Sequence, residues 1–188
     1  MTARDRARRF ERMALPHLDA AYGLARWLAG SASDAEDIVQ EAYLRAFTYF
    51  DGYRGDNARA WLLSVTRNAA MDWLKRHRPA ALVPLYEVTE ESGAVRGQTS
   101  LDAAPDTPEE AVLRRADRAT LNRLVAALPL PYREVLVLRE VHDLSYQEIA
   151  AVAAIPVGTV MSRLARARSR IRRGWLAQER DDGWRDDG

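Results

Sequence analysis

One segment near the C-terminal end constrains the fold more than any other part of the chain. Ser145 and Glu148 have the spacing of a capping box, in which each side chain bonds the other's backbone at a helix start. Pro156 then interrupts the helix, because proline has no N–H to donate and disfavours helix in the residue before it. A second helix begins near Val157. A short helix, a tight turn and a longer helix predict a helix-turn-helix over about residues 145–173.

The second helix of this motif has two different faces when residues are placed at about 100° each. One narrow stripe is apolar and should pack on the preceding helices: Val160, Leu164, Ala167 and Ile171. The opposite face combines small residues with arginines: Ser162, Ala165, Arg166, Ser169 and Arg173. Small side chains let the backbone approach a groove, and guanidinium groups reach guanine edges or phosphates. The pattern favours binding to double-stranded DNA over an ordinary solvated basic face.

Charge is segregated along the chain, although the net charge is only +1. Residues 157–178 contain six arginines and no acid, whereas residues 86–110 contain seven acids and one base. The last ten residues are acidic again. A basic segment beside acidic ones is typical of a chain with a localised nucleic-acid-binding surface.

Composition excludes several classes of function. The chain has no cysteine, so disulfides, cysteine zinc sites and thiol catalysis are excluded. The three histidines are scattered without ligand-like spacing, and no nucleophile elbow, phosphate-binding glycine loop or paired-carboxylate site is recognisable. We therefore expect no enzymatic activity, no small-molecule substrate, no cofactor and no metal. We also expect a cytoplasmic protein, because no apolar run is long enough for an export signal or a membrane span.

Helical periodicity dominates the chain, and no segment shows the period of two that strands require. The fold class is therefore predicted to be all-α, with two small helical domains joined by a flexible acidic linker. The first clear helix is expected to begin at Ser33, where Ser33 and Glu36 have capping-box spacing, and the next covers residues 57–77. The predicted boundaries place the first domain at 1–80, the linker at 81–107, the second domain at 108–178 and an acidic tail at 179–188.

The 57–77 helix carries a wide apolar arc, in which Trp61 and Trp73 are expected to be core residues. Its remaining stripe consists of Ser64, Arg67, Asn68, Met71, Asp72 and Lys75. A solvated face is the favoured interpretation of this stripe, although asparagine beside arginine also suits the reading of base edges. Just before this helix, Tyr53 and Phe50 near Arg54 could stack on an unpaired base, with core packing favoured for Phe50.

The 33–50 helix presents a polar stripe away from its apolar positions: Asp34, Asp37, Gln40 and Glu41. Carboxylates at this spacing could bind a metal ion. A solvated or protein-binding face is favoured, because no histidine or fourth ligand accompanies them.

Two sets of motifs resemble the extracytoplasmic-function (ECF) sigma factors of bacterial RNA polymerase. Residues 34–47, DAEDIVQEAYLRAF, and residues 59–72, RAWLLSVTRNAAMD, are similar to sigma region 2. Residues 128–140, LPLPYREVLVLRE, together with LSYQEIA at 144–150 and IPVGTVMSRLARAR at 155–168, are similar to region 4. The resemblance covers almost the whole chain except the linker and the tail.

The resemblance implies a subunit that joins core RNA polymerase, through its clamp helices and flap, and directs transcription from specific promoters. Region 4 would read the −35 element of the promoter as duplex, with Ser162, Arg163 and Arg166 at the matching positions. Region 2 would recognise and melt the −10 element, with Asn68 at a base-reading position. The Phe50 to Asn57 loop would receive a flipped base. Together with the residues expected from the chain itself, the predicted −10 set is Phe50, Tyr53, Arg54, Asn57, Arg67 and Asn68.

The resemblance also implies protein partners. Asp37, Gln40 and Glu41 match the surface that docks on core polymerase, and an anti-sigma factor, which can be membrane-anchored, would hold the protein inactive. Met161 and Ala165 depart from the family, whose members often carry a basic or bulkier DNA-contacting side chain there.

Two other functions remain open from the residues alone. A helix-turn-helix response regulator or repressor would be a dimer on a palindromic site. A nucleic-acid-modifying enzyme would need a metal or acid–base constellation.

Overall fold

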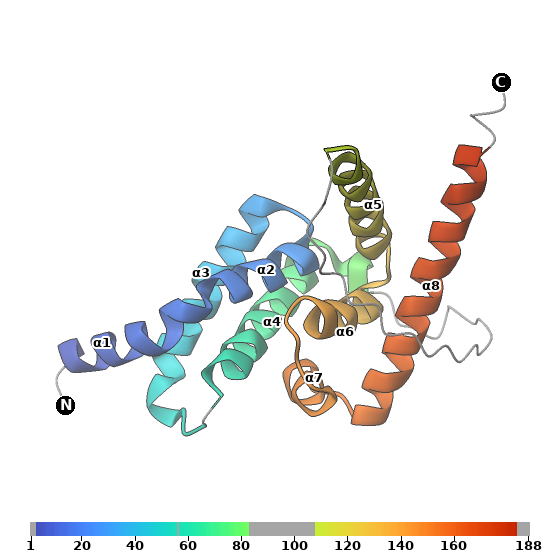
Figure 1. The fold of residues 1–188 in the computed structure, drawn as a ribbon. Helices are drawn as coiled ribbons and strands as arrows, with labels where there is room; N and C mark the ends of the chain where they lie inside the picture. Colours follow the sequence, from blue (N-terminus) through green and yellow to red (C-terminus); the bar gives the residue numbers. More distant parts are fainter. Residues whose placement is uncertain (1–2, 56, 83–107, 184–188) are drawn as a thin grey trace.

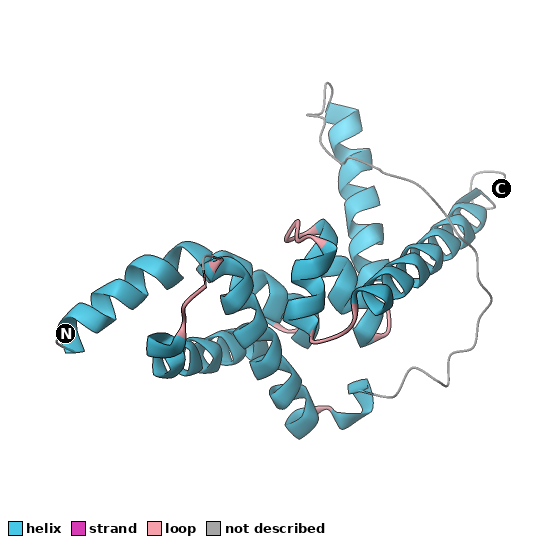
Figure 2. Ribbon diagram, turned by 90° about the horizontal axis from the view of Figure 1, so that it is seen from below, coloured by secondary structure: helices cyan, strands magenta, loops and turns pink. Residues whose placement is uncertain are grey.

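A computed structural model describes residues 3–55, 57–82 and 108–183, and all of the secondary structure in these ranges is helical. The N-terminal lobe, residues 3–82, contains α1 (Ala3–Ala14), η1 (Leu15–His17), α2 (Leu18–Ala29), α3 (Ala32–Tyr49), η2 (Phe50–Gly52), α4 (Ala58–His77) and η3 (Pro79–Leu82). The C-terminal lobe, residues 108–183, contains α5 (Pro108–Ala126), α6 (Leu130–Glu140), α7 (Tyr146–Ala153) and α8 (Val157–Gly183). Figure 2 shows helices joined by short loops throughout the described parts.

Local signals locate most of these helices correctly. Asn57 caps α4, its side-chain oxygen accepting a hydrogen bond from the Ala60 N–H at 2.9 Å. The capping box at Ser145 is formed in both directions and starts α7. Ala154 ends α7 in the left-handed region at φ 54°, and α8 then leaves at about 100° to α7. The predicted helix-turn-helix is therefore confirmed in its place and shape.

Three details of the sequence-based expectation were wrong. The first helices are α1 and α2, ahead of the helix expected at Ser33, and the cap of α3 is Ser31, whose Oγ accepts from the Asp34 N–H at 3.4 Å. Met71 is only 9% exposed, although the stripe was expected to be solvated, because it packs in the main hydrophobic core. Trp61 and Trp73 pack against core residues but are themselves only partly buried.

The two lobes pack directly on each other. Helix α2 contacts α6 and helix α4 contacts α7, a contact surface that we call the lobe interface (Figure 1). One continuous cluster of buried apolar side chains draws members from both lobes, among them Leu63 of α4 and Ile149 of α7. The predicted linker, 81–107, lies outside the described residues apart from 81–82. Helix α8 continues through Gly183 into the predicted tail. Residues 184–188 of that tail lie outside the described residues.

Candidate DNA and polymerase interfaces

Helix α8 has the two-sided character that the sequence predicts. Val160, Leu164 and Ala167 are at most 1% exposed and hold the helix on the C-terminal lobe. On the other side Ser162, Ala165, Arg166 and Arg173 are exposed, whereas Arg163 and Ser169 are partly buried. The small side chains leave the backbone accessible between the arginines, as binding in a major groove requires.

Not all of the arginines on α8 are available to a ligand. Arg168 donates to a Glu140 carboxylate oxygen at 2.7 Å, which raises the pKa of the guanidinium and ties α8 to α6. Arg170 lies over the Tyr132 ring at 5.5 Å. These two arginines therefore fix α8 in the lobe, and the outward arginines carry the charge that a nucleic acid would meet.

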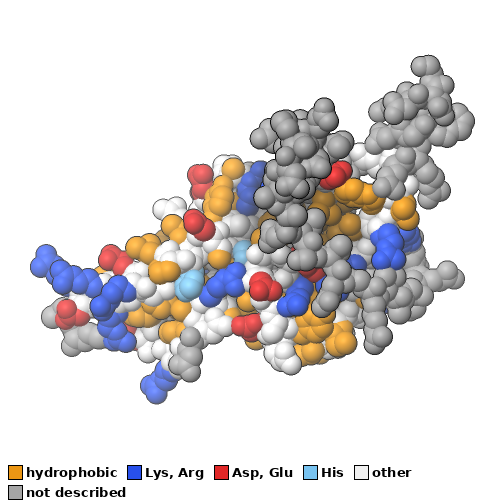
Figure 3. Space-filling view, viewed as in Figure 1, with side chains coloured by type: hydrophobic (Ala, Val, Ile, Leu, Met, Phe, Trp, Pro, Cys, Tyr) orange, Lys and Arg blue, Asp and Glu red, His pale blue; other side chains and the backbone are white. Residues whose placement is uncertain are grey.

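The aromatic residues of the candidate −10 loop are packed rather than open. Phe50 is 8% exposed, and its ring meets Phe10 of α1 edge-on at 5.4 Å, which fits the core role favoured for it. Tyr53 lies against Trp61 at 4.7 Å between ring centroids, and Arg54 is exposed. Helix α1 is fastened to this loop, since Arg6 forms a 2.9 Å ion pair with Asp51. Arginine side chains gather over α1 on the surface shown in Figure 3.

Two of the candidate −10 residues are bound by acids of the C-terminal lobe. Arg67 Nε donates to Glu134 Oε1 at 2.6 Å, and the Glu134 side chain is only 3% exposed. Asn57 Nδ2 donates to Glu148 Oε1 at 2.6 Å. Asn68 stays exposed, and its side-chain oxygen accepts a hydrogen bond from Arg67 at 3.4 Å. The lobe interface thus occupies one donor group of Arg67 and one of Asn57 that DNA could otherwise meet.

Sequence reasoning missed Glu134 and Glu148 as partners of these residues. The available signal for Glu134 was a single acid inside the apolar run of α6, because an isolated charge is rarely buried without a partner. Hydrogen bonds from the Ser145 backbone and hydroxyl, followed by the one from Asn57, lower the pKa of Glu148 despite partial burial. Glu148 is therefore held as a carboxylate that both caps α7 and accepts from the other lobe.

Two further polar residues line the lobe interface. Arg133 Nη1 donates to the Trp27 carbonyl of α2 at 3.2 Å. His142 is 3% exposed beside Gly23 of α2, and a methyl group added at Gly23 would lie 3.6 Å from the imidazole Cε1. Burial, with a smaller contribution from the positive charge of Arg59, lowers the pKa of His142 to about 4. The imidazole is therefore neutral at physiological pH.

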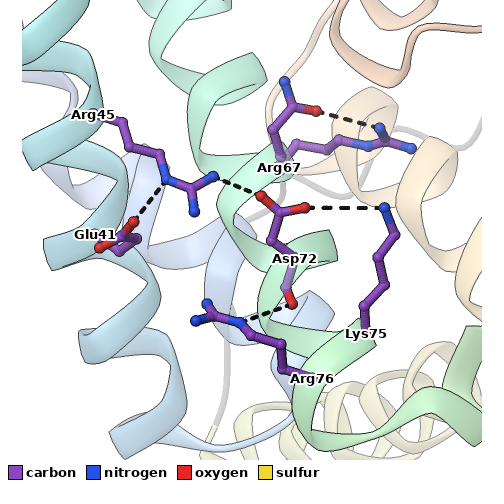
Figure 4. A network of polar contacts seen from close by, with 7 residues as sticks. Glu41, Arg45, Arg67, Asp72, Lys75 and Arg76 are labelled. Atoms are coloured by element: carbon purple, nitrogen blue, oxygen red, sulfur yellow. Dashed lines mark hydrogen bonds and ion pairs between the residues drawn. The ribbon is translucent and has the colours of Figure 1, made fainter.

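The candidate polymerase surface lies on α3 and is partly tied to α4. Asp37 and Gln40 are exposed, whereas Glu41 accepts a hydrogen bond from Arg45, which also donates to Asp72 at 2.7 Å (Figure 4). These bonds raise the pKa of Arg45 and lower that of Asp72.

Two large apolar side chains on the same helix were missed by the sequence analysis. Leu44 is 60% exposed and Tyr49 is 70% exposed. Leu44 follows Asp37 and Gln40 at helical spacing on one face, so the available signal was an apolar residue at the end of a polar stripe.

Within the ranges that the structure describes, no group of three or more metal-ligating side chains comes together. No single helix there is long and apolar enough to cross a bilayer. Taken together, α7 and α8 would be long and apolar enough, but they meet at an angle of 100°.

A helix-turn-helix lobe packed on a second helical lobe with a polar, asparagine-containing face defines a DNA-binding protein of two parts. Comparison with known proteins identifies both parts. Residues 13–79 match the family model for sigma-70 region 2, and residues 118–171 match the model for sigma-70 region 4.

Characterised relatives agree with these matches. The chain is 36% identical to the RNA polymerase sigma-H factor of Pseudomonas aeruginosa over 168 residues, covering 87% of this chain and 84% of the relative. It is 37% identical to the ECF RNA polymerase sigma-E factor of Escherichia coli over 145 residues, covering 74% and 73%. The chain belongs to the ECF family of sigma factors, whose members bind core RNA polymerase and promoter DNA to start transcription.

Solved structures show the same fold. The sigma factor RpoE of Bartonella quintana, in complex with the anti-sigma factor NepR, aligns with a TM-score of 0.64 at 24% identity and covers 89% of this chain and 96% of its own. CnrH in complex with the cytosolic domain of CnrY aligns with a TM-score of 0.59 at 25% identity, covering 91% and 90%.

Proposed function

We propose that the two lobes read the two promoter elements with the residues expected from the sequence. The exposed face of α8, with Ser162, Ala165 and Arg166 at its centre, enters the major groove of the −35 duplex. Arg163, Ser169 and Arg173 flank this face and contact phosphates or bases. The observation that carries this proposal is the division of α8 into a buried apolar stripe and an exposed small-and-basic face.

The N-terminal lobe recognises and melts the −10 element. Asn68 is exposed and reads a base edge, while Arg67 and Asn57 become available once the lobe interface opens. Arg54 and Tyr53 supply a charge and a ring at the loop that accepts an extruded base. Phe50, being buried under Phe10, supports this loop from within.

Core polymerase docks on the exposed side of α3. Asp37, Gln40 and Glu41 provide polar contacts, and the exposed Leu44 supplies apolar area on the same face. Exposed apolar area beside polar contacts is the composition expected of a protein–protein interface. The protein acts by binding in the cytoplasm, where polymerase works, rather than by catalysing a reaction of its own.

An anti-sigma factor controls the protein. This part of the proposal rests on the solved structures that share the fold, since both are complexes of a sigma factor with such a partner or with a partner's cytosolic domain.

In vitro transcription with purified core polymerase tests the proposed function. The full chain should direct initiation from promoters that core polymerase alone does not use. Arg166→Ala should lose about 1–3 kcal/mol of binding and relax the sequence preference at one −35 position. Arg118→Ala, which changes an exposed arginine on α5, is the matched control and should leave both unchanged. If the full chain neither bound core nor added initiation, the proposal would be wrong.

A further inference from the structure

Two apolar side chains stand on the exposed side of α8 within its first two turns. Val157 is 37% exposed and Met161 is 55% exposed, and residues four apart lie on the same side of a helix. Val160 and Leu164, which alternate with them, are at most 1% exposed and supply the packing of this part of α8. About half of Met161 and a smaller part of Val157 are therefore left outside the core of the lobe.

The surroundings of this apolar pair are small and uncharged. A methyl group added at Gly158 would have no atom within 4 Å, so the backbone there is open to a close approach. Ser162 is exposed, and its hydroxyl donates to the Thr159 carbonyl at 3.1 Å. The oxygen of Ser162 consequently keeps its lone pairs as acceptors. Arg163 is partly buried, and the first exposed arginine is Arg166, so the exposed face begins with apolar surface before it presents charge.

The major groove offers one apolar group to such a surface, the 5-methyl group of thymine. Polar base edges placed against methionine and valine would lose water without gaining a hydrogen bond, which costs free energy. Methionine is flexible and polarisable, so it can adjust its thioether and methyl groups to a methyl group in the groove. The chemistry of the pair therefore favours A·T pairs over G·C pairs at the facing position.

We propose that Met161, supported by Val157, determines −35 specificity by contacting thymine 5-methyl groups. The −35 element of this protein accordingly contains a thymine at the position that faces Met161, on one strand or the other. This inference rests on the proposed function, in which the exposed face of α8 enters the −35 duplex.

The test uses holoenzyme assembled from the full chain and core polymerase. A duplex library with a randomised segment upstream of a fixed −10 segment yields the preferred −35 element. Each thymine in that element is then replaced singly by deoxyuridine, which removes the methyl group and leaves the hydrogen-bonding edge intact. Wild-type holoenzyme should lose about fourfold in affinity at one or two positions, the factor that corresponds to one buried methyl group.

Substitutions assign the effect to Met161. Met161→Ala should bind thymine and uracil equally at that position, and Met161→Leu should retain most of the discrimination. Leu176→Ala is the matched control, because Leu176 is a 46% exposed apolar residue on the same helix beyond the helix-turn-helix. It should discriminate as the wild type does.

The outcomes separate this inference from the function on which it rests. If the library yields a specific element in which every deoxyuridine is neutral, methyl reading is overturned while −35 recognition stands. If Met161→Ala still distinguishes thymine from uracil, the assignment of methyl reading to Met161 is overturned. If the library yields no preferred element at all, the proposed function itself fails.

Discussion

The ion pair between Arg67 and Glu134 should decide how firmly the lobes hold together. It joins α4 to α6 across the lobe interface at 2.6 Å, and the two side chains are 20% and 3% exposed. Glu134→Gln keeps the size of the side chain and removes its charge. The variant leaves Arg67 with an uncompensated positive charge in a largely buried position.

The expected cost follows from this geometry. Removing one partner of a fully buried pair costs about 3–5 kcal/mol, whereas exposed pairs are worth about 0–1 kcal/mol. Arg67 retains some contact with solvent, so we expect a loss of about 2–3 kcal/mol from the lobe interface. Because about 1.4 kcal/mol corresponds to a factor of ten, the ratio of closed to open molecules should fall by roughly 30- to 150-fold.

Distance measurements between the lobes can detect this change. The chain has no cysteine, so spin labels on Glu36→Cys in α3 and Gln147→Cys in α7, both exposed, report on the interface without background. Pulsed electron resonance should show one narrow distance distribution in the wild type and longer, broader distances in Glu134→Gln. Glu140→Gln is the matched control, because it removes an acid from the same helix whose partner, Arg168, belongs to the same lobe.

A second readout addresses function. Opening the interface frees Arg67, so the isolated Glu134→Gln protein should bind a single-stranded −10 oligonucleotide more tightly than wild type or Glu140→Gln. Circular dichroism verifies that the variant keeps its overall helix content, and Arg67→Gln probes the same pair from the other side. Unchanged distances in both Glu134→Gln and Arg67→Gln would refute the argument that this pair holds the lobes together.

Three further outcomes follow from single side chains. Burial lowers the pKa of His142 from 6.5 to about 4, so the contribution of the neutral imidazole to stability is complete above pH 6.5 and declines as the pH falls toward 4. At pH 5 the loss should be about 2 kcal/mol. Denaturant titrations should show this loss as a pH dependence that His142→Gln removes and that the control His17→Gln preserves. Ser145→Ala removes the capping box of α7 and should lower the free energy of unfolding by about 1 kcal/mol in the same titrations. Ala154→Gly should instead raise it by about 0.5–1 kcal/mol, because alanine is strained at φ 54°; a lower stability would contradict that reasoning.

Local chemistry made the C-terminal lobe and α4 predictable. The capping box at Ser145, the break at Pro156 and the cap at Asn57 are formed by residues within a few positions of each other, so their outcome hardly depends on the rest of the fold. The apolar stripe of α8 was likewise visible, since a 3.6-residue period survives any tertiary arrangement.

Other features depend on partners far away in the chain and could not be read locally. Helix α1 is rich in arginine and has few apolar anchors, and it is fixed by the ion pair of Arg6 with Asp51 in η2 and by the packing of Phe10 on Phe50. Helix α2 buries mostly small residues, which give a weak hydrophobic period. The ion pair of Arg67 with Glu134, 67 residues later in the chain, forms only when the two lobes dock. The composition of the segment between the lobes gives no information on how they dock.

The lobe interface makes the two DNA-reading surfaces unequally accessible. On α8, Met161, Ser162 and Arg166 are exposed, whereas on the N-terminal lobe Arg67 and Asn57 are engaged by carboxylates. Those carboxylates place negative charge against the same donors that DNA phosphates would contact, so the closed lobes and a −10 strand compete for one set of hydrogen bonds. A protein arranged in this way can offer its −35 helix while closed but needs the lobes to part before it can use its full −10 surface. We therefore expect core polymerase to shift the wild-type distances toward those of Glu134→Gln before any promoter is added.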